Sequence, residues 1–248
     1  MPSEKISAMP PATFLGGTEI LPIIQNGGNY SVSVANLRNN NLVCLFGYNN
    51  TGSTQNSSAS FGLFNTASGY ASSAFGYQNT SAGQTANAFG YLNIASGANS
   101  NAVGYQNTAS GTSSSAVGYH NTVEEANGCA FGYFNTANLG CSAFGINNNA
   151  TGFQSSAFGR YNTASNNYCA AFGYANTASG YQSSAIGFAN TASGIYSHVF
   201  GHQCENSTDT SAQIGYQDYF LNVGVNGCRI SIGGTVYTFN EATGTFLP

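Results

Sequence analysis

The sequence predicts an all-β protein in which the chain winds into a β-solenoid with small β segments at both ends. Three observations support this: a 14-residue repeat, an Ala-x-Gly pattern in both halves of the repeat, and a composition with few charges. We expect three parts, an N-terminal β segment (residues 1–40), the 14-residue-repeat solenoid (residues 41–216) and a C-terminal β cap or tip (residues 217–248).

The repeat is marked by the glycine that ends each Ala-Phe-Gly-like triplet. Ten of the twelve intervals between successive glycines are 14 residues; Gly47 and Gly62 are 15 apart, and Gly132 and Gly145 are 13 apart. This period is too short for a pair of helices. It fits two strands of about five residues and two tight turns, which make one coil of a β-solenoid.

The half-repeat predicts which residues face the interior, because alternate residues of a strand share a face. In Ala185-Ile186-Gly187 and Ala178-Ser179-Gly180, the small residues lie on one face and the middle residue on the other. The two strands of a narrow coil approach closely, so we expect alanine and glycine inside. The outward residue of the second strand is usually serine, as at Ser68, Ser96, Ser110, Ser165, Ser179 and Ser193.

The outward residue of the first strand is apolar in every coil, and we call this set the apolar column. Its members are Phe46, Phe61, Phe75, Phe89, Val103, Val117, Phe131, Phe144, Phe158, Phe172, Ile186, Phe200 and Ile214. At roughly 4.8 Å a coil, the column would run about 58 Å. A soluble monomer rarely exposes so much apolar surface, so we expect burial around a threefold axis in a homotrimer. The alternative is a monomer with phenylalanine inside, which would place serine against phenylalanine.

The repeated sequence resembles the head repeat of YadA-like trimeric adhesins over about residues 42–216. Examples of the repeat are SSAIG at 183–187, SAFG at 156–159 and TASG at 177–180. This resemblance implies a left-handed parallel β-roll of three chains around one axis. The bacterial members also carry an export signal, a heptad stalk and a C-terminal membrane-barrel segment. We identify none of these in the sequence, and therefore do not expect a surface autotransporter.

Residues 1–40 precede the repeat, and TEILPII and NYSVSVANL predict two strands joined by the turn signal QNGG. The stretch EKISAMPPATFLGGTEILPIIQNGGNYSVSVANL resembles N-terminal segments of tailed-phage fibre and other virion proteins. That resemblance implies a virion anchor over residues 5–37. The anchor residues it indicates are Ile6, Pro10, Glu19, Leu21, Pro22 and Gln25. The alternative is a hairpin that only caps the solenoid.

Residues 217–248 predict a small β meander, because apolar residues alternate between the turn signals NG and GG. If this segment forms the tip of a fibre, it is the natural place for contact with a receptor. Four aromatic residues could lie either at that contact or in the core of a trimer: Tyr216, Tyr219, Phe220 and Tyr237.

The composition excludes several classes of protein. Only 4 basic and 8 acidic residues are present, 5% of the chain, so a basic surface for nucleic acid is absent. No apolar run approaches the roughly 20 residues that span a bilayer, and the first residues do not read as a signal peptide. The six cysteines lack a C-x-x-C pair, which favours buried fillers and synthesis in the cytoplasm.

His198 and His202 form the one candidate metal site. They share a face with Phe200, so a trimer would present rings of imidazoles to an ion on its axis, with Cys204 two residues further on. The alternative is that His202 replaces the tyrosine, and His198 the serine, of other coils.

No residues predict catalysis or a cofactor. The adjacent Glu124 and Glu125 replace a Ser-Gly pair and predict a solvated turn rather than an acid/base pair. The repeated Asn-Thr pairs predict stacked turn asparagines, in a left-handed conformation or bonded to their own backbone. Their amides would form ladders along the rod.

These observations favour a non-enzymatic trimeric fibre or spike of a phage virion, made in the host cytoplasm. We expect a rigid rod attached by its N-terminus and contributing to host-surface adhesion. The expected partners are two further copies, other virion proteins and a host surface glycan, with neither nucleic acid nor membrane insertion. Two alternatives remain open: a soluble ice- or surface-binding solenoid with ranks of threonine, and a cellular trimeric adhesin head fragment.

Overall fold

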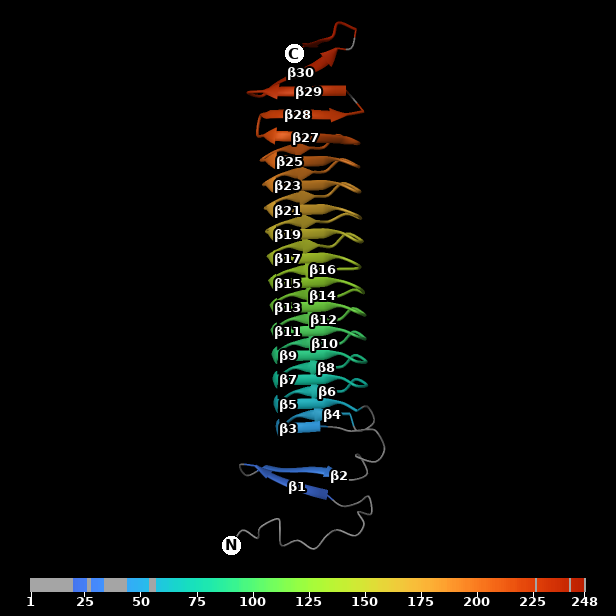
Figure 1. Cartoon of the computed structure of the whole chain (residues 1–248), viewed down its shortest axis with the longest axis vertical. Helices are drawn as coiled ribbons and strands as arrows, with labels where there is room; N and C mark the ends of the chain where they lie inside the picture. The colour runs from blue at the N-terminus through green and yellow to red at the C-terminus, as the bar shows by residue number, and fades with distance from the viewer. Residues whose placement is uncertain are drawn as a thin grey trace.

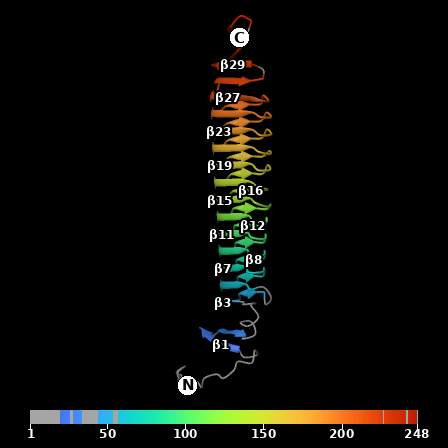
Figure 2. The ribbon, with the colours of Figure 1, turned by 45° about the vertical axis from the view of Figure 1, so that its right-hand side comes forward.

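A computed structural model describes residues 20–25, 28–33, 44–53, 57–225, 227–240 and 242–247. These residues form strands and turns but no helix. They build a rod with a hairpin at the N-terminal end and a meander at the C-terminal end (Figure 1). Two stacks of parallel strands run side by side along the rod (Figure 2). The predicted parallel β-solenoid is therefore confirmed.

The first stack, the long-strand sheet, contributes one strand of five or six residues to each coil. Its parallel strands are β3 (Cys44–Tyr48), β5 (Ala59–Leu63), β7 (Ser73–Tyr77), β9 (Asn87–Tyr91), β11 (Asn101–Tyr105), β13 (Ser115–Tyr119), β15 (Cys129–Tyr133), β17 (Ser142–Ile146), β19 (Ser156–Arg160), β21 (Ala170–Tyr174), β23 (Ser184–Phe188), β25 (His198–His202) and β27 (Ser211–Tyr216).

The second stack, the short-strand sheet, contributes only two residues to each coil. Its strands are β4 (Thr51–Gly52), β6 (Thr66–Ala67), β8 (Thr80–Ser81), β10 (Ile94–Ala95), β12 (Thr108–Ala109), β14 (Thr122–Val123), β16 (Thr136–Ala137), β18 (Asn149–Ala150), β20 (Thr163–Ala164), β22 (Thr177–Ala178), β24 (Thr191–Ala192) and β26 (Glu205–Asn206). The prediction of two strands of similar length was wrong, because turns take up the rest of this half-coil.

The register places like residues on like residues. Ala102 of β11 pairs with Ala116 of β13, and Gly104 pairs with Gly118. The same register holds across the two irregular intervals, where Phe46 pairs with Phe61 and Phe131 with Phe144. Each side-chain position therefore becomes a straight column along the rod.

Alanine fills the interior, as predicted, and the arrangement with phenylalanine inside is excluded. Ala102 of the long-strand sheet and Ala109 of the short-strand sheet are both fully buried. The glycine that follows in the short-strand half, such as Gly180, is also buried, but Gly187 at the matching place of the long strand is exposed. The prediction was therefore wrong for the long-strand glycines.

A different requirement fixes glycine in the long strands. Gly104 has a φ of 119°, which L side chains rarely adopt, and an added Cβ would lie 2.1 Å from the carbonyl oxygen of Gly118. The Gly118 carbonyl points to the neighbouring coil, where it accepts a hydrogen bond from Asn107 Nδ2 at 2.8 Å. Glycine is thus required by backbone approach between coils, not by the narrowness of the interior.

The turns explain the seven-residue half-repeat. A residue with φ between 41° and 59° recurs every seven residues, as at Thr85, Leu92 and Asn99. Its backbone N–H donates to the preceding coil: Leu92 to the carbonyl of Tyr77 at 2.9 Å, and Thr85 to that of Tyr70 at 2.7 Å. These bonds between coils help to hold the left-handed conformation, which is unfavourable for non-glycine residues.

The two irregular repeats change only a turn. The left-handed residues Asn49 and Ser57 are eight apart, and Phe134 and Gly140 are six apart. The inserted and deleted residues therefore lie outside the strands. This is why the strand register survives both.

A column of asparagines runs through the interior. Asn121 Nδ2 lies within hydrogen-bonding distance of three acceptors, Asn107 Oδ1 at 3.0 Å and the carbonyls of Val117 and Gly132 at 2.9 and 2.8 Å. The backbone N–H of Asn121 donates to the same Asn107 Oδ1 at 3.0 Å. The predicted ladder is confirmed, but the left-handed residue is the one before each asparagine, such as His120 with a φ of 53°. The ladder comprises Asn50, Asn65, Asn79, Asn93, Asn107, Asn121, Asn135, Asn148, Asn162, Asn176 and Asn190.

The ends of the chain form antiparallel strands. The hairpin β1 (Ile20–Gln25) and β2 (Gly28–Ser33) pairs Gln25 with Gly28, as the turn signal predicted. At the other end, β28 (Tyr219–Gly224), β29 (Gly227–Ile232), β30 (Thr235–Asn240) and β31 (Thr245–Leu247) extend the long-strand sheet from β27. The short-strand sheet ends at β26, so this meander continues only one of the two sheets.

Candidate functional site: an apolar face along the rod

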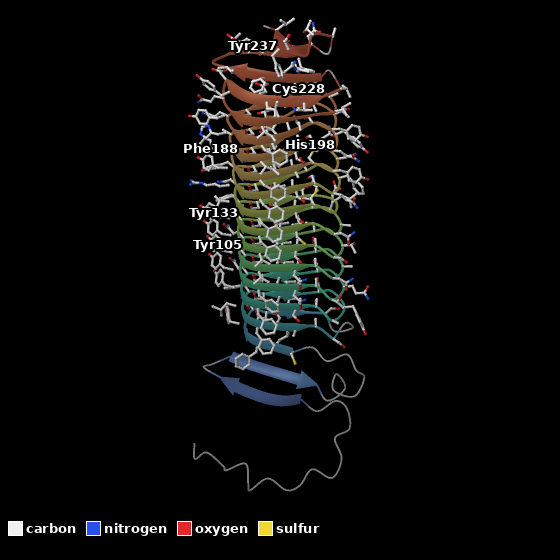
Figure 3. The ribbon with its side chains drawn as sticks, turned by 45° about the horizontal axis from the view of Figure 1, so that its top comes forward. Tyr105, Tyr133, Phe188, His198, Cys228 and Tyr237 are labelled. Atoms are coloured by element: carbon white, nitrogen blue, oxygen red, sulfur yellow. The ribbon has the colours of Figure 1, made fainter. Side chains whose placement is uncertain are left out.

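The apolar column lies on the outer face of the long-strand sheet, where its side chains form a continuous line (Figure 3). Phe46, Phe200 and Ile214 expose 51%, 41% and 58% of their surface. The others are half-buried, because each ring packs on its neighbours; Phe61 and Phe75, for example, stack at 4.7 Å. The outward direction predicted for the column is thus observed, while its role in a trimer stays a prediction.

The apolar line continues into the C-terminal meander, where Tyr237 was one of the residues expected either at a receptor contact or in the core of a trimer. The register places Ile214 opposite Leu221, Leu221 opposite Ile230, and Ile230 opposite Tyr237. The alternation in FLNVGV, CRISI and TVYTF predicted the strands, whereas their register with the column follows only from the structure. We call the set the distal apolar face: Leu221, Val223, Ile230, Ile232, Tyr237, Phe239 and Phe246. Four of these, Ile230, Ile232, Tyr237 and Phe246, line an apolar hollow of about 220 Å³.

A second column, aromatic in most coils, is formed by the residue after each long-strand glycine; Leu63, Ile146 and Arg160 are its non-aromatic members. Tyr105, Tyr133 and Phe188 project from one edge of the sheet in Figure 3, separate from the central line of phenylalanines. Neighbouring rings lie nearly parallel, with Tyr105 and Tyr119 4.8 Å apart and 5° from coplanar. Such pairs contribute roughly 0.5–1.5 kcal/mol beyond their burial. This column therefore stiffens the rod edge.

Arg160 interrupts the tyrosine column. Its guanidinium lies 4.8 Å from the ring centre of Tyr161 and donates from Nη2 to the Tyr161 hydroxyl at 3.3 Å. This hydrogen bond and the positive charge lower the pKa of Tyr161. Both side chains are on the exposed surface, so the pair has little effect on stability.

The opposite face of the rod is polar. The predicted outward serines are confirmed, since Ser96 and Ser110 are exposed and Ser179 is half-buried. Between them and the ladder lies a rank of threonines in register, with Thr108 paired to Thr122. The rod therefore has one apolar and one polar face.

The structure does not bring the two candidate metal ligands together within one chain. His198 and His202 stand at opposite ends of β25, four residues apart, which is about 13 Å in an extended strand. The His202 ring stacks between Phe188 at 4.7 Å and Tyr216 at 4.6 Å, as in the tyrosine column. A shared ion would need the same histidine from three chains, which stays a prediction about the assembly.

Cys204 cannot join such a site, because its side chain is buried inside the rod. It occupies the next place of the asparagine ladder, and its backbone N–H donates to Asn190 Oδ1 at 3.0 Å. Burial raises the pKa of the Cys204 thiol, which disfavours the thiolate that metals bind. Among the described residues, no three His, Cys, Asp or Glu side chains gather as a metal site would require.

The remaining predicted residues fall in three places. Glu124 and Glu125 are exposed in a turn, as expected.

All six cysteines are free, and those in the interior fill space between the two sheets. Cys169 Sγ, for example, lies 3.0 Å from the carbonyl of Gly180. Of the proposed anchor residues, Leu21, Pro22 and Gln25 lie in β1, whereas Ile6, Pro10 and Glu19 lie outside the described residues.

Comparison with known proteins supports the repeat. The family model described as YadA head domain repeat matches residues 95–121, 150–176, 170–190 and 178–197. No curated protein matches the chain. None of the described residues forms a helix that is long and apolar enough to cross a membrane. The matched coils share their geometry with the others, so the central rod is similar to YadA head domain repeats.

Proposed function

We propose that this chain is a non-enzymatic subunit of a trimeric virion fibre of a phage. In this assembly three rods pack side by side, the N-terminal segment attaches to the particle, and the C-terminal meander projects outward. The rod is a stiff spacer, and its distal end contributes to adhesion to the host surface. β-Solenoids of the YadA head type are typically non-enzymatic adhesin parts, which agrees with this proposal.

The observation that carries the proposal is the unbroken apolar face. It starts at Phe46 in β3 and continues through the distal apolar face to Phe246 in β31. A soluble monomer seldom exposes a contiguous apolar patch of more than a few hundred Å². Three identical faces meeting around one axis would remove this surface from water in every coil at once.

The assignment of the two ends rests on their sequences and on the strands they form. Residues 5–37 resemble phage virion anchors, and part of this segment forms the hairpin β1–β2. The meander at the other end places both polar and apolar side chains at the tip. Anchor at the N-terminus and contact at the C-terminus is therefore the arrangement we propose.

Electron microscopy of purified particles tests the assignment. An antibody against the meander should label the outer ends of the rods. An antibody against residues 1–19 should not label intact particles, because the attachment site covers that segment. Absence of the protein from particles, or rods attached by the meander, would contradict the proposal.

One observation favours a second candidate function. Threonines such as Thr108, Thr122 and Thr136 stand in register on the polar face, which is the flat repeat of hydroxyls that an ice- or surface-binding solenoid needs. Ile94 and Asn149 interrupt the rank. A thermal-hysteresis measurement on the purified chain distinguishes the two functions. Thermal hysteresis would support ice binding, and its absence would favour the fibre.

A further inference from the structure

The interior column changes chemistry where the solenoid ends. From β7 to β23 it consists of alanine, and in β25 of Val199, which pairs with Gln213 of β27. The same line then continues from Gln213 to Asn222 and from Asn222 to Arg229. Gln213 and Asn222 are each only 3% exposed. Three polar side chains thus extend the line at the point where the short-strand sheet ends.

Two hollows meet at this point. One, of about 180 Å³, is lined by residues that include Thr208, Asn222 and Arg229. The other, of about 530 Å³, is lined by residues that include Gln217 and Asp218. Both are also lined by Glu205, Gln213 and Phe220. We call the two together the distal groove.

The donors and acceptors in the groove are only partly matched to one another. Arg229 Nη2 donates to Thr208 Oγ1 at 3.1 Å and lies 3.4 Å from Asn222 Oδ1. Its Nε is buried and has no hydrogen-bond partner among the described residues. A buried donor without a partner is unfavourable, so the guanidinium of Arg229 is incompletely satisfied within the chain.

The charges and the ring indicate the chemistry of that ligand. Glu205 and Asp218 are exposed carboxylates, and with the single Arg229 they leave the groove negative, which disfavours an anion. Hydroxyl groups can donate to the carboxylates and accept from the guanidinium and amides. Phe220, half-buried between the hollows, offers a flat apolar surface to the C–H face of a sugar ring.

We propose that the distal groove binds an uncharged saccharide, with one pyranose ring on Phe220 and its hydroxyls bonded to Arg229 and Glu205. This rests on the proposed function, in which the meander meets the host surface. Phe220 and Asn222 alternate with Leu221 and Val223, so the groove lies on the face opposite the distal apolar face. A trimer built through the apolar face would leave three grooves open and gain avidity.

Saturation-transfer NMR on the full chain tests the proposal. The probes are glucose, galactose, mannose, N-acetylglucosamine and lactose, with N-acetylneuraminic acid as the charged comparison. We expect transfer to at least one neutral sugar, and a loss of affinity of at least about tenfold in Arg229→Ala and in Phe220→Ala. The control Ser110→Ala, on the polar face far along the rod, should bind as the unmodified chain does.

The groove is ruled out if no neutral sugar shows transfer, or if N-acetylneuraminic acid binds more tightly than every neutral sugar. Unchanged binding in both variants also overturns it. If those two variants fail to fold, the exposed changes Gln217→Ala and Glu205→Gln decide, and unchanged affinity in both overturns the groove. The mass of the same samples separates the two proposals: a trimer without sugar binding contradicts only the groove, whereas a monomer contradicts the fibre.

Discussion

The regular coils and the C-terminal meander differ in how they cover the two faces of the long-strand sheet. Each coil from β5 to β25 backs its long strand with a short strand, and together they enclose alanine, serine and asparagine. The meander from β28 to β31 continues the long-strand sheet without a second layer over most of its extent. Val223 and Ile232 there expose 50% and 58% of their surface.

This difference shows where each region obtains its stability. The coils satisfy most of their buried polar groups within one chain, through the asparagine ladder and the bonds between turns, and need partners only for one outer face. The meander has almost no interior of its own, so its apolar residues need another chain. We therefore expect assembly to matter far more for the meander than for the coils.

The largest effect should come from a charge on the apolar column. In Phe144→Asp, a trimer would bring three carboxylates into an apolar seam, and each unpaired buried charge costs several kcal/mol. We expect loss of the trimer in sedimentation velocity. Ser179→Asp on the polar face is the matched control and should assemble normally; equal tolerance of both changes would contradict the assignment of faces.

The next largest effect should come from the ladder. Asn121→Ala removes the donor to the carbonyls of Val117 and Gly132, and the Oδ1 that accepts from Asn135. Since several buried groups lose a partner, we expect unfolding free energy to fall by at least about 3 kcal/mol. Ser110→Ala should change it by less than about 0.5 kcal/mol. Chemical denaturation measures both, and a loss below about 1 kcal/mol for Asn121→Ala would argue against a ladder that supports the coils.

A third prediction addresses the comparison itself. In the dissociated Phe144→Asp chain, amide hydrogens of β28 to β31 should exchange quickly, because their sheet has lost its cover. Amides of β11 to β21 should stay protected, because their bonds lie between coils of one chain. Hydrogen-exchange mass spectrometry resolves the two regions. Equal protection of both would mean that the meander is stable without partners.

The smallest effect concerns Tyr161 on the rod edge. Arg160 lowers its pKa by a hydrogen bond and by charge, so Arg160→Leu should return that pKa toward the ordinary value for tyrosine. A pKa that is lower in the folded chain means that the unfolded chain binds more protons, so this pair favours folding slightly as the pH rises through the Tyr161 pKa. A titration of Tyr161 followed by NMR checks the shift; the same pKa in both proteins would show that Arg160 has no influence.

Strand alternation predicted much of the solenoid from the sequence. Ala74 and Phe75 could be assigned to opposite faces because neighbours in a strand point to opposite sides. The long-strand glycines broke that rule, since at Gly76 the φ of 119° ends regular alternation. Residue size alone could not reveal this, because an exposed glycine and a buried glycine look the same in sequence.

The turns and the tip were harder to predict, each for a physical reason. Left-handed turn residues such as Gln78 and Tyr161 are not the usual asparagine or glycine, because bonds between coils hold them in place. Phe220 and Arg229 of the distal groove meet only through the antiparallel register of β28 and β29. The registered pairing, rather than any local motif, creates that groove.

The mass of the full chain in solution tests the central claim most directly. If the apolar face from Phe46 to Phe246 is buried between copies, sedimentation equilibrium should give three times the 25.6 kDa of one chain, with no dissociation on dilution to nanomolar concentration. A stable, soluble species of 25.6 kDa would contradict the claim, since the apolar face would then remain in water.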